Sequence, residues 1–187
     1  MKKIIIIGAG AMGSAFAVPC LENQNEVTLV GTHLEDDLIN NIKSFNYNIS
    51  SDISSSAFFI VLTLLSKKSS LTVKNVNINP SRAGSINILN KMGAKIIFRN
   101  KRKYKGEKIA DIYVKSAKFL KAIKCPAKYN SSAIDEFLII FLVAAKSKGI
   151  SFFKDLSELN QKESPRLRLG SKILNMIGVR TELTNDS

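Results

Sequence analysis

The sequence changes character near residue 43, and any fold has to accommodate both sides of this change. Residues 1–43 carry three Lys and five acidic residues, a net charge of −2, whereas residues 44–187 carry +15. An apolar run and a glycine-rich turn dominate the first part, while helical and strand patterns alternate in the second. The break predicts two structural units, residues 1–43 and residues 44–187, each with its own chemistry.

The composition is typical of a globular protein with a core. Apolar residues make up 45% of the chain and charged residues 23%. The longest apolar runs, Ala57–Leu65 and Phe137–Ala145, reach about half a membrane span and therefore predict core helices and no membrane contact. Cys20 and Cys125 lie far apart and have no metal-ligand spacing. We therefore expect no metal site and a cytoplasmic location.

The densest positive charge lies in RNKRKYKGEK, residues Arg99–Lys108. Basic segments can bind nucleic acid, anionic membranes or phosphorylated substrates. This one contains a single aromatic residue, Tyr104, and no recognisable nucleic-acid motif surrounds it. We expect a solvated hairpin and no nucleic-acid partner.

The first unit is predicted to be a truncated Rossmann βαβ opening. Lys3–Ile7 contains a β-branched run, typical of a strand buried on both faces of a parallel sheet, and Glu26–Val30 predicts a second strand. A helix is expected between them, through about Leu21, and another over Leu34–Lys43.

A glycine-rich turn directly follows the first of these strands. Gly8, Gly10 and Gly13 form the pattern G-x-G-x-x-G at the start of a helix. The first glycine permits a tight turn, the second lets the backbone approach a pyrophosphate, and the third lets helix pack on strand. The three glycines are therefore predicted to bind NAD(P), and a turn used only for packing is the alternative.

The stretch IIIIGAGAMGSAFAVPCLENQNEVTLVGTHLEDDLINNIK, ending at Lys43, resembles the amino terminus of NAD(P)-dependent glycerol-3-phosphate dehydrogenase. The resemblance implies that the three glycines hold the cofactor pyrophosphate and that Gly31–His33 lies near the adenosine ribose. No acidic residue ends the second strand, so NAD and NADP both stay open. The catalytic lysine region and the substrate domain of that family have no counterpart in this chain.

The second unit is predicted to be α/β or α+β. Four helices are expected, at residues 52–65, 86–92, 134–146 and 165–177. Strands are expected at residues 71–76, 95–98 and 109–115, with others at 119–124, 150–154 and 179–183.

Asp135 and Glu136 form a first polar cluster in this unit. They directly precede the apolar run FLIIFLVAA, which predicts a helix. Carboxylates at a helix start commonly interact with the positive end of the helix dipole. The residues by themselves therefore indicate a structural role for this pair.

A second polar cluster lies in QKESPR, residues 161–166. Ser164 suits an N-cap and Pro165 the first helical position, which places Lys162 and Glu163 just before a helix and Arg166 in its first turn. Two cations and free backbone N–H groups at one point can bind a phosphate or carboxylate. Glu163 is then a candidate acid–base group, and a plain capping motif is the alternative.

The motifs DISSSAFF, NINPSRAG, KMGA, IDE and KESPR occur in this order between about Phe45 and Ser187. In this order they resemble EPSP synthase (3-phosphoshikimate 1-carboxyvinyltransferase). The resemblance implies βαβαββ units in two inside-out α/β domains with the active site between them. It also implies transfer of the enolpyruvyl group of phosphoenolpyruvate to the 5-hydroxyl of shikimate 3-phosphate, by addition and elimination, without a metal or organic cofactor.

The same resemblance assigns roles to five residues. Asp135 would act as the base for the shikimate hydroxyl, and Lys162 would contact the same hydroxyl. Glu163 would handle the proton at the phosphoenolpyruvate methylene. Arg166 would bind the phosphate or carboxylate of phosphoenolpyruvate, and Glu136 is a further candidate for substrate contact. Arg82 and Gly84 match a family turn that is interpreted as structural.

Several parts of the family's site have no counterpart here. The amino-terminal Lys–Ser pair, the glycine-rich loop with its Arg and the Ser–Gln segment are missing, and the late His–Arg pair is missing because His33 is the only histidine. We therefore expect a partial EPSP synthase-like α/β domain after a truncated Rossmann opening, inactive by itself. An NAD(P)-binding dehydrogenase fragment and a non-functional fusion are the alternatives, and the oligomeric state stays open.

Overall fold

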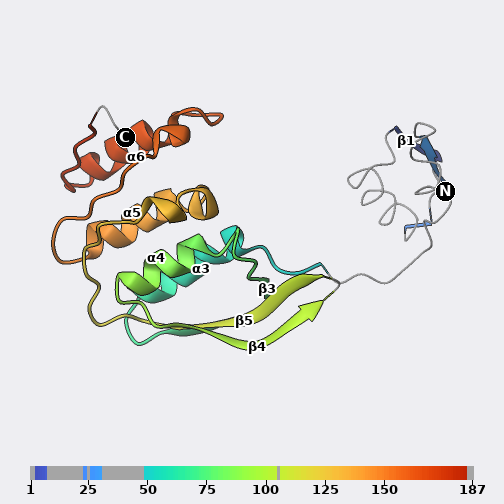
Figure 1. The fold of residues 1–187 in the computed structure, drawn as a ribbon, viewed down its shortest axis with the longest axis horizontal. Coiled ribbons are helices and arrows are strands. Elements are labelled where there is room, and N and C mark those ends of the chain that lie inside the picture. Colours follow the sequence, from blue (N-terminus) through green and yellow to red (C-terminus); the bar gives the residue numbers. More distant parts are fainter. Residues whose placement is uncertain (1–2, 8–22, 25, 31–48, 105, 185–187) are drawn as a thin grey trace. The chain divides into compact units, whose positions relative to one another are not determined.

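The computed structural model describes residues 3–7, 23–24, 26–30, 49–104 and 106–184 (Figure 1). The chain forms two compact units, residues 1–48 and residues 49–187. The predicted boundary at residue 43 lies outside the described residues, as do Gly8, Gly10 and Gly13. The NAD(P) site and the two helices expected in the first unit therefore stay predictions.

The described part of the first unit is a pair of parallel strands. β1 (Lys3–Ile7) lies beside β2 (Glu26–Val30), with Lys3 opposite Glu26 and Ile7 opposite Val30. Both predicted strands are confirmed. Parallel neighbours need a crossover connection rather than a tight turn, because both strands run in the same direction.

The second unit contains a three-stranded antiparallel sheet. Its strands are β3 (Ser70–Asn77), β4 (Ile96–Tyr104) and β5 (Glu107–Lys115), in the order β3–β5–β4. Leu71 and Ile96 both lie opposite the fully buried Val114. Because side chains alternate between the faces of a sheet, this row faces the core while Tyr113 faces outward.

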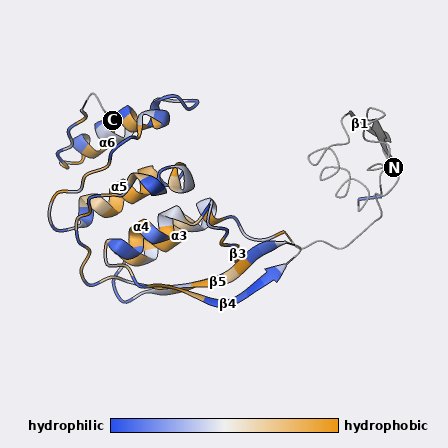
Figure 2. Cartoon of the chain, in the orientation of Figure 1, coloured by the Kyte–Doolittle hydropathy of each residue, from blue (hydrophilic) through white to orange (hydrophobic). Residues whose placement is uncertain are grey.

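β4 and β5 form the hairpin that the basic run predicts, but both strands extend further than expected. The ladder continues past a register shift between Arg99 and Arg102 and reaches the pair Tyr104–Glu107. From Arg99 onward β4 consists almost entirely of polar and charged residues, so apolar residues indicate a strand only over Ile96–Phe98. Figure 2 shows the far end of β4 as hydrophilic. Arg99 lies 3.9 Å from the ring centre of Tyr113.

Four helices cover one face of this sheet in successive layers. α3 (Ile53–Leu65) and α4 (Gly84–Lys91) pack on the strands, α5 (Phe137–Lys146) packs on both of them, and α6 (Arg166–Met176) packs on α5 (Figure 1). The predicted α/β class is confirmed.

The hydrophobic core lies where the sheet, α3, α4 and α5 meet. Its largest fully buried side chains come from all four of these parts and include Ile53, Ile60, Leu64, Ile88, Leu89, Ile112, Phe137 and Ile140. Phe137 also packs against Phe153, with ring centres 6.0 Å apart, and so ties α5 to the segment that follows it.

Three of the predicted strands are wrong. Residues 119–124 run beside residues 148–152 and are joined to them by two isolated parallel bridges, Lys121 with Lys148 and Lys124 with Phe152, without a continuous ladder. Residues 179–183 are irregular. Their backbone is diverted by Thr181, whose N–H donates to the side-chain oxygen of Asn175 at 3.1 Å.

Candidate functional site

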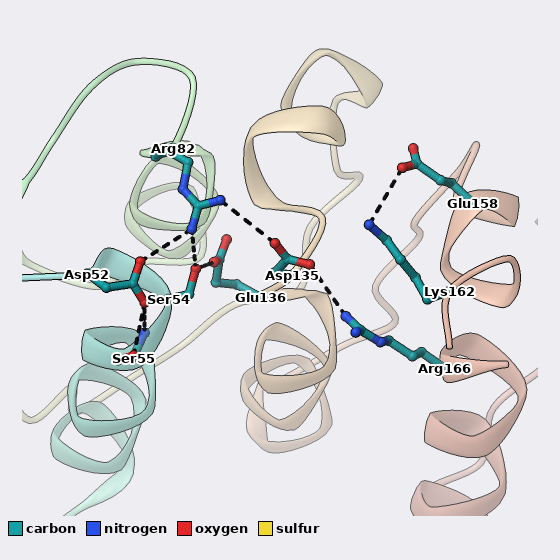
Figure 3. Close-up of polar contacts among 9 residues, drawn as sticks. All are labelled: Asp52, Ser54, Ser55, Arg82, Asp135, Glu136, Glu158, Lys162 and Arg166. Atoms are coloured by element: carbon teal, nitrogen blue, oxygen red, sulfur yellow. Dashed lines mark hydrogen bonds and ion pairs between the residues drawn. The ribbon is translucent and has the colours of Figure 1, made fainter. Parts of the chain in front are cut away.

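The starts of α3, α4, α5 and α6 lie on the same side of the second unit and are joined by ion pairs (Figure 3). Asp52 is the N-cap of α3, and Arg82 lies in the turn before α4. Asp135 directly precedes the N-cap of α5, and Arg166 opens α6. Helix amino termini carry partial positive charge and unpaired N–H groups, so their convergence favours anions.

Asp52 is held in place by its own helix. Its carboxylate accepts hydrogen bonds from the backbone N–H of Ser55 at 2.7 Å and from the Ser55 hydroxyl at 2.9 Å. Arg82 Nη2 lies 3.3 Å from the other oxygen. Burial raises the pKa of Asp52, but the hydrogen bonds and the Arg82 charge outweigh it and hold the pKa below its usual value.

Glu136 is the buried carboxyl group of the cluster. It is 5% exposed and accepts a hydrogen bond from the Ser54 hydroxyl on α3. Burial raises its pKa above the usual value, while the Ser54 hydrogen bond and the Arg82 charge partly counteract this. The structure thus directs Glu136 toward α3, and its predicted contact with substrate stays a prediction.

Asp135 lies between two guanidinium groups. Arg82 Nη1 is 3.8 Å from Oδ2, and Arg166 Nη1 is 3.4 Å from Oδ1. The Asp135 side chain is 39% exposed, so one side of it is open to solvent and to a ligand. Each oxygen therefore has a guanidinium group beside it.

Arg166 also binds Glu163, with Nη2 2.7 Å from Oε2. The backbone N–H of Glu163 itself, and then Arg166, hold the pKa of this exposed carboxyl below its usual value. Lys162 contacts Glu158 instead, at 3.8 Å, on the short 3-10 helix Ser157–Asn160. The structure therefore brings Asp135, Glu163 and Arg166 together, with Lys162 next to them in the chain.

The predicted capping of α6 is wrong. Pro165, not Ser164, is the N-cap, and the carbonyl of Ser164 accepts from the N–H of Arg166 at 2.7 Å. This tight turn takes Ser164 out of the capping position. Asn160 supplies an oxygen instead and accepts from the N–H of Arg168 at 3.2 Å.

Sequence reasoning did not assign site contacts to Ser54 or Arg82. The family resemblance predicts a structural turn at Arg82, and the structure adds its contacts with Asp52, Ser54 and Asp135. No local signal identifies these partners, because Arg82 and Asp135 are far apart in the sequence. Asp52 was identifiable, since an acid followed by Ser-rich residues and an apolar run is a common helix start.

Other features of the described residues lie away from this cluster. A shallow groove of about 500 Å³ is lined by Lys124, Cys125, Phe152 and Lys154, and burial raises the pKa of the Cys125 thiol. In the described part of the chain, no group of three or more His, Cys, Asp or Glu residues is placed to hold a metal ion. None of the helices described is long and apolar enough to cross a membrane.

Comparison with known proteins identifies the family. Residues 27–187 match the family model of EPSP synthase (3-phosphoshikimate 1-carboxyvinyltransferase). The chain belongs to the EPSP synthase family. The match begins at residue 27 and so includes most of β2, and it gives no support to the dehydrogenase resemblance predicted for residues 1–43.

EPSP synthase relatives resemble the chain in sequence and in structure. The 3-phosphoshikimate 1-carboxyvinyltransferase of Ruthia magnifica is 38% identical and covers 88% of this chain, and that of Legionella pneumophila strain Paris is 42% identical over 74%. The EPSP synthase structure from Acinetobacter baumannii superposes with a TM-score of 0.75, at 36% identity over 85% of this chain. The chain covers 36%, 32% and 34% of these proteins, about a third of each.

Proposed function

We propose that this chain forms one wall of an EPSP synthase active site, which transfers the enolpyruvyl group of phosphoenolpyruvate to shikimate 3-phosphate in the cytoplasm. One observation carries the proposal. Asp135, Glu163 and Arg166, which match the family's site motifs, form a single ion-paired cluster where four helices begin. A cluster of this kind suits two anionic substrates and a proton transfer between them.

The chemistry divides among these residues. Asp135 removes the proton of the 5-hydroxyl of shikimate 3-phosphate, and the oxygen adds to C2 of phosphoenolpyruvate. Glu163 supplies a proton to the methylene carbon, which completes the tetrahedral intermediate. Loss of a proton from the new methyl group then expels phosphate and restores the double bond. Arg166 neutralises the anionic groups of phosphoenolpyruvate during both steps.

Lys162 is assigned to the 5-hydroxyl of shikimate 3-phosphate. Its ion-pair partner among the described residues is the exposed Glu158, at 3.8 Å. An exposed pair of this kind contributes at most about 1 kcal/mol, so Lys162 can leave it for a substrate at little cost. The proposed reaction uses no metal and no organic cofactor.

The proposal assigns binding rather than rapid turnover to this chain. Its family residues supply the base, the proton donor and one anion-binding arginine, but not the other phosphate-binding groups that the family resemblance implies. Catalysis depends on groups held around both substrates at once. We therefore expect measurable binding of shikimate 3-phosphate and turnover far below that of a full-length relative.

Isothermal titration with shikimate 3-phosphate tests this proposal. Lys162→Ala is expected to weaken binding about tenfold or more, the loss typical of a charge-assisted hydrogen bond. Lys172→Ala removes an exposed lysine from the same region and is the matched control, expected to bind as the original chain does. Equal affinity of both variants, or no binding by the unaltered chain, would contradict the proposal.

A second candidate function concerns the first unit. The parallel pairing of β1 and β2 supports a dinucleotide-binding opening, since the glycine pattern follows β1 directly. This candidate assigns NAD(P) binding to Gly8, Gly10 and Gly13. NAD(P)H fluorescence titration tests it, and Gly10→Asp is expected to abolish binding by placing a carboxylate beside the pyrophosphate. A chain that binds neither ligand indicates a non-functional fusion.

A further inference from the structure

Arg82 joins carboxylates that belong to two different helix starts. Its Nη2 atom lies 3.3 Å from Asp52 and donates to the Ser54 hydroxyl at 2.9 Å, while Nη1 lies 3.8 Å from Asp135 (Figure 3). A guanidinium group can make such contacts together because its donors form a rigid planar fork. Arg82 therefore connects the start of α3 to the residue just before the N-cap of α5.

The α3 end of this connection is firmly held. Asp52 accepts two hydrogen bonds from Ser55 while capping the helix, so its carboxylate has little freedom to follow Arg82. The Asp135 end is held differently, because its carboxylate contacts the two arginines, Arg82 and Arg166, and the N-cap position of α5 belongs to Glu136. The position of Asp135 thus depends on Arg82 more than the reverse.

Arg166, the other cation at Asp135, has competing partners. It contacts Glu163 at 2.7 Å as well as Asp135 at 3.4 Å. Under the proposed function it also binds an anionic group of phosphoenolpyruvate, which competes with both carboxylates for the same N–H donors. When Arg166 turns to this substrate, Arg82 still provides a cation beside Asp135.

We propose that Arg82 is a positioning residue for Asp135, holding the carboxylate in place while Arg166 binds the second substrate. The role given to Asp135 rests on the proposed function. The contact between Arg82 and Asp135 does not, so the two can be tested separately.

Three substitutions test the positioning role by titration with shikimate 3-phosphate at saturating phosphoenolpyruvate. Arg82→Gln removes the charge and is expected to weaken binding about fivefold, the upper range for a partly exposed ion pair. Arg82→Lys keeps the charge but not the fork and is expected to recover part of this loss. Arg180→Gln, at an 88% exposed arginine paired with Glu182, is the control and is expected to have no effect.

A double substitution distinguishes positioning from simple loss of stability. In a chain that carries Asp135→Asn, Arg82→Gln is expected to cause no further weakening, because its effect passes through Asp135. Equal weakening in both backgrounds overturns the proposal, since a purely structural defect would act whether or not Asp135 is ionisable.

The carboxyl-carbon NMR signal of Asp135 needs no ligand and separates the two proposals. We expect this signal to shift in Arg82→Gln and to stay unchanged in Arg180→Gln. An unchanged signal in Arg82→Gln overturns the positioning role. A shifted signal in a chain that does not bind shikimate 3-phosphate supports the Arg82–Asp135 contact and overturns the proposed function alone.

Discussion

At the scale of single residues, Asp135 and Glu136 are neighbours in the chain with opposite environments. Asp135 is partly exposed between two arginines, whereas Glu136 is 5% exposed and bonded to Ser54. The difference arises because consecutive residues at a helix start point in different directions, one toward the ion pairs and one toward α3. Packing, rather than residue type, therefore gives these adjacent carboxylates different burial and different hydrogen-bond partners.

Glu136→Gln tests the energetic consequence of this burial. The pKa of Glu136 is raised in the folded protein, so its contribution to stability is present below the unfolded-state pKa and is lost as pH rises through the folded value. The neutral amide does not ionise. We therefore expect the free energy of unfolding, measured with urea between pH 4 and pH 7, to fall with rising pH in the original chain relative to the Glu136→Gln variant.

Asp52 and Glu163 act in the opposite direction and at lower pH. Their pKa values are lowered, so the stability they contribute is present above the unfolded-state values and is lost as pH falls through the folded ones. The original chain and the Glu136→Gln variant both contain Asp52 and Glu163, so the contribution of these two residues to the free energy of unfolding cancels when the two proteins are compared. Glu182→Gln, at an exposed carboxylate, is the matched control. Parallel pH profiles for Glu136→Gln and the original chain would show that burial of Glu136 has no energetic effect.

At the scale of elements, the start of α4 depends on a close approach to the short 3-10 helix Ser131–Ala133. A Cβ atom at Gly84 would lie 2.7 Å from the carbonyl carbon of Ser132 and 2.8 Å from its oxygen. These distances are shorter than real Cβ atoms tolerate, and backbone atoms cannot move aside cheaply. Glycine at this position therefore sets how closely the segment before α5 packs on α4.

Gly84→Ala is expected to lower the free energy of unfolding by about 1–3 kcal/mol, the usual cost of overpacking. The control is Gly170→Ala in α6, where the new Cβ meets the mobile end of Leu138 at 2.8 Å. Alanine also favours a helix interior over glycine by up to about 1 kcal/mol, so the control should be nearly neutral. Urea unfolding of both variants measures the difference, and equal stability would contradict the packing argument.

At the scale of the whole molecule, the second unit leaves large apolar side chains exposed on its helices. Phe58, Phe59 and Leu62 on α3 are 65%, 61% and 64% exposed, and Ile173 and Met176 on α6 are 58% and 77% exposed. Phe58 and Leu62 are one helical turn apart and so lie on one face. Exposed apolar rows of this kind bind apolar ligands or other protein surfaces.

We expect the chain to bind a hydrophobic fluorescent dye and to self-associate as its concentration rises. The double substitution Phe58→Ser and Leu62→Ser should reduce dye fluorescence at least twofold by removing adjacent apolar side chains. Phe119→Ser, at an 87% exposed residue outside the helices, is the control for loss of one isolated ring. Sedimentation at two concentrations provides the second measurement. Equal dye binding by the control and the double variant would contradict the role of α3.

The sequence by itself determined the family, the α/β class and the approximate places of the four helices of the second unit, and it predicted Asp135, Lys162, Glu163 and Arg166 as site residues. These predictions depend on the order of motifs and on local apolar periodicity, and both can be observed directly in the sequence. It also predicted the hairpin β4–β5, though not its full length, because the basic outer half carries no apolar alternation.

Only the tertiary structure decided how these parts meet. The contact of Arg82 with Asp135 and the burial of Glu136 against Ser54 join residues far apart in sequence, and no local pattern encodes such pairs. The segments 119–124 and 150–154 pair only through isolated bridges, and whether such bridges extend into a ladder also depends on backbone geometry beyond the local sequence. Local sequence patterns therefore predict where helices and strands form, whereas packing and ion pairs between distant residues decide which side chains come into contact.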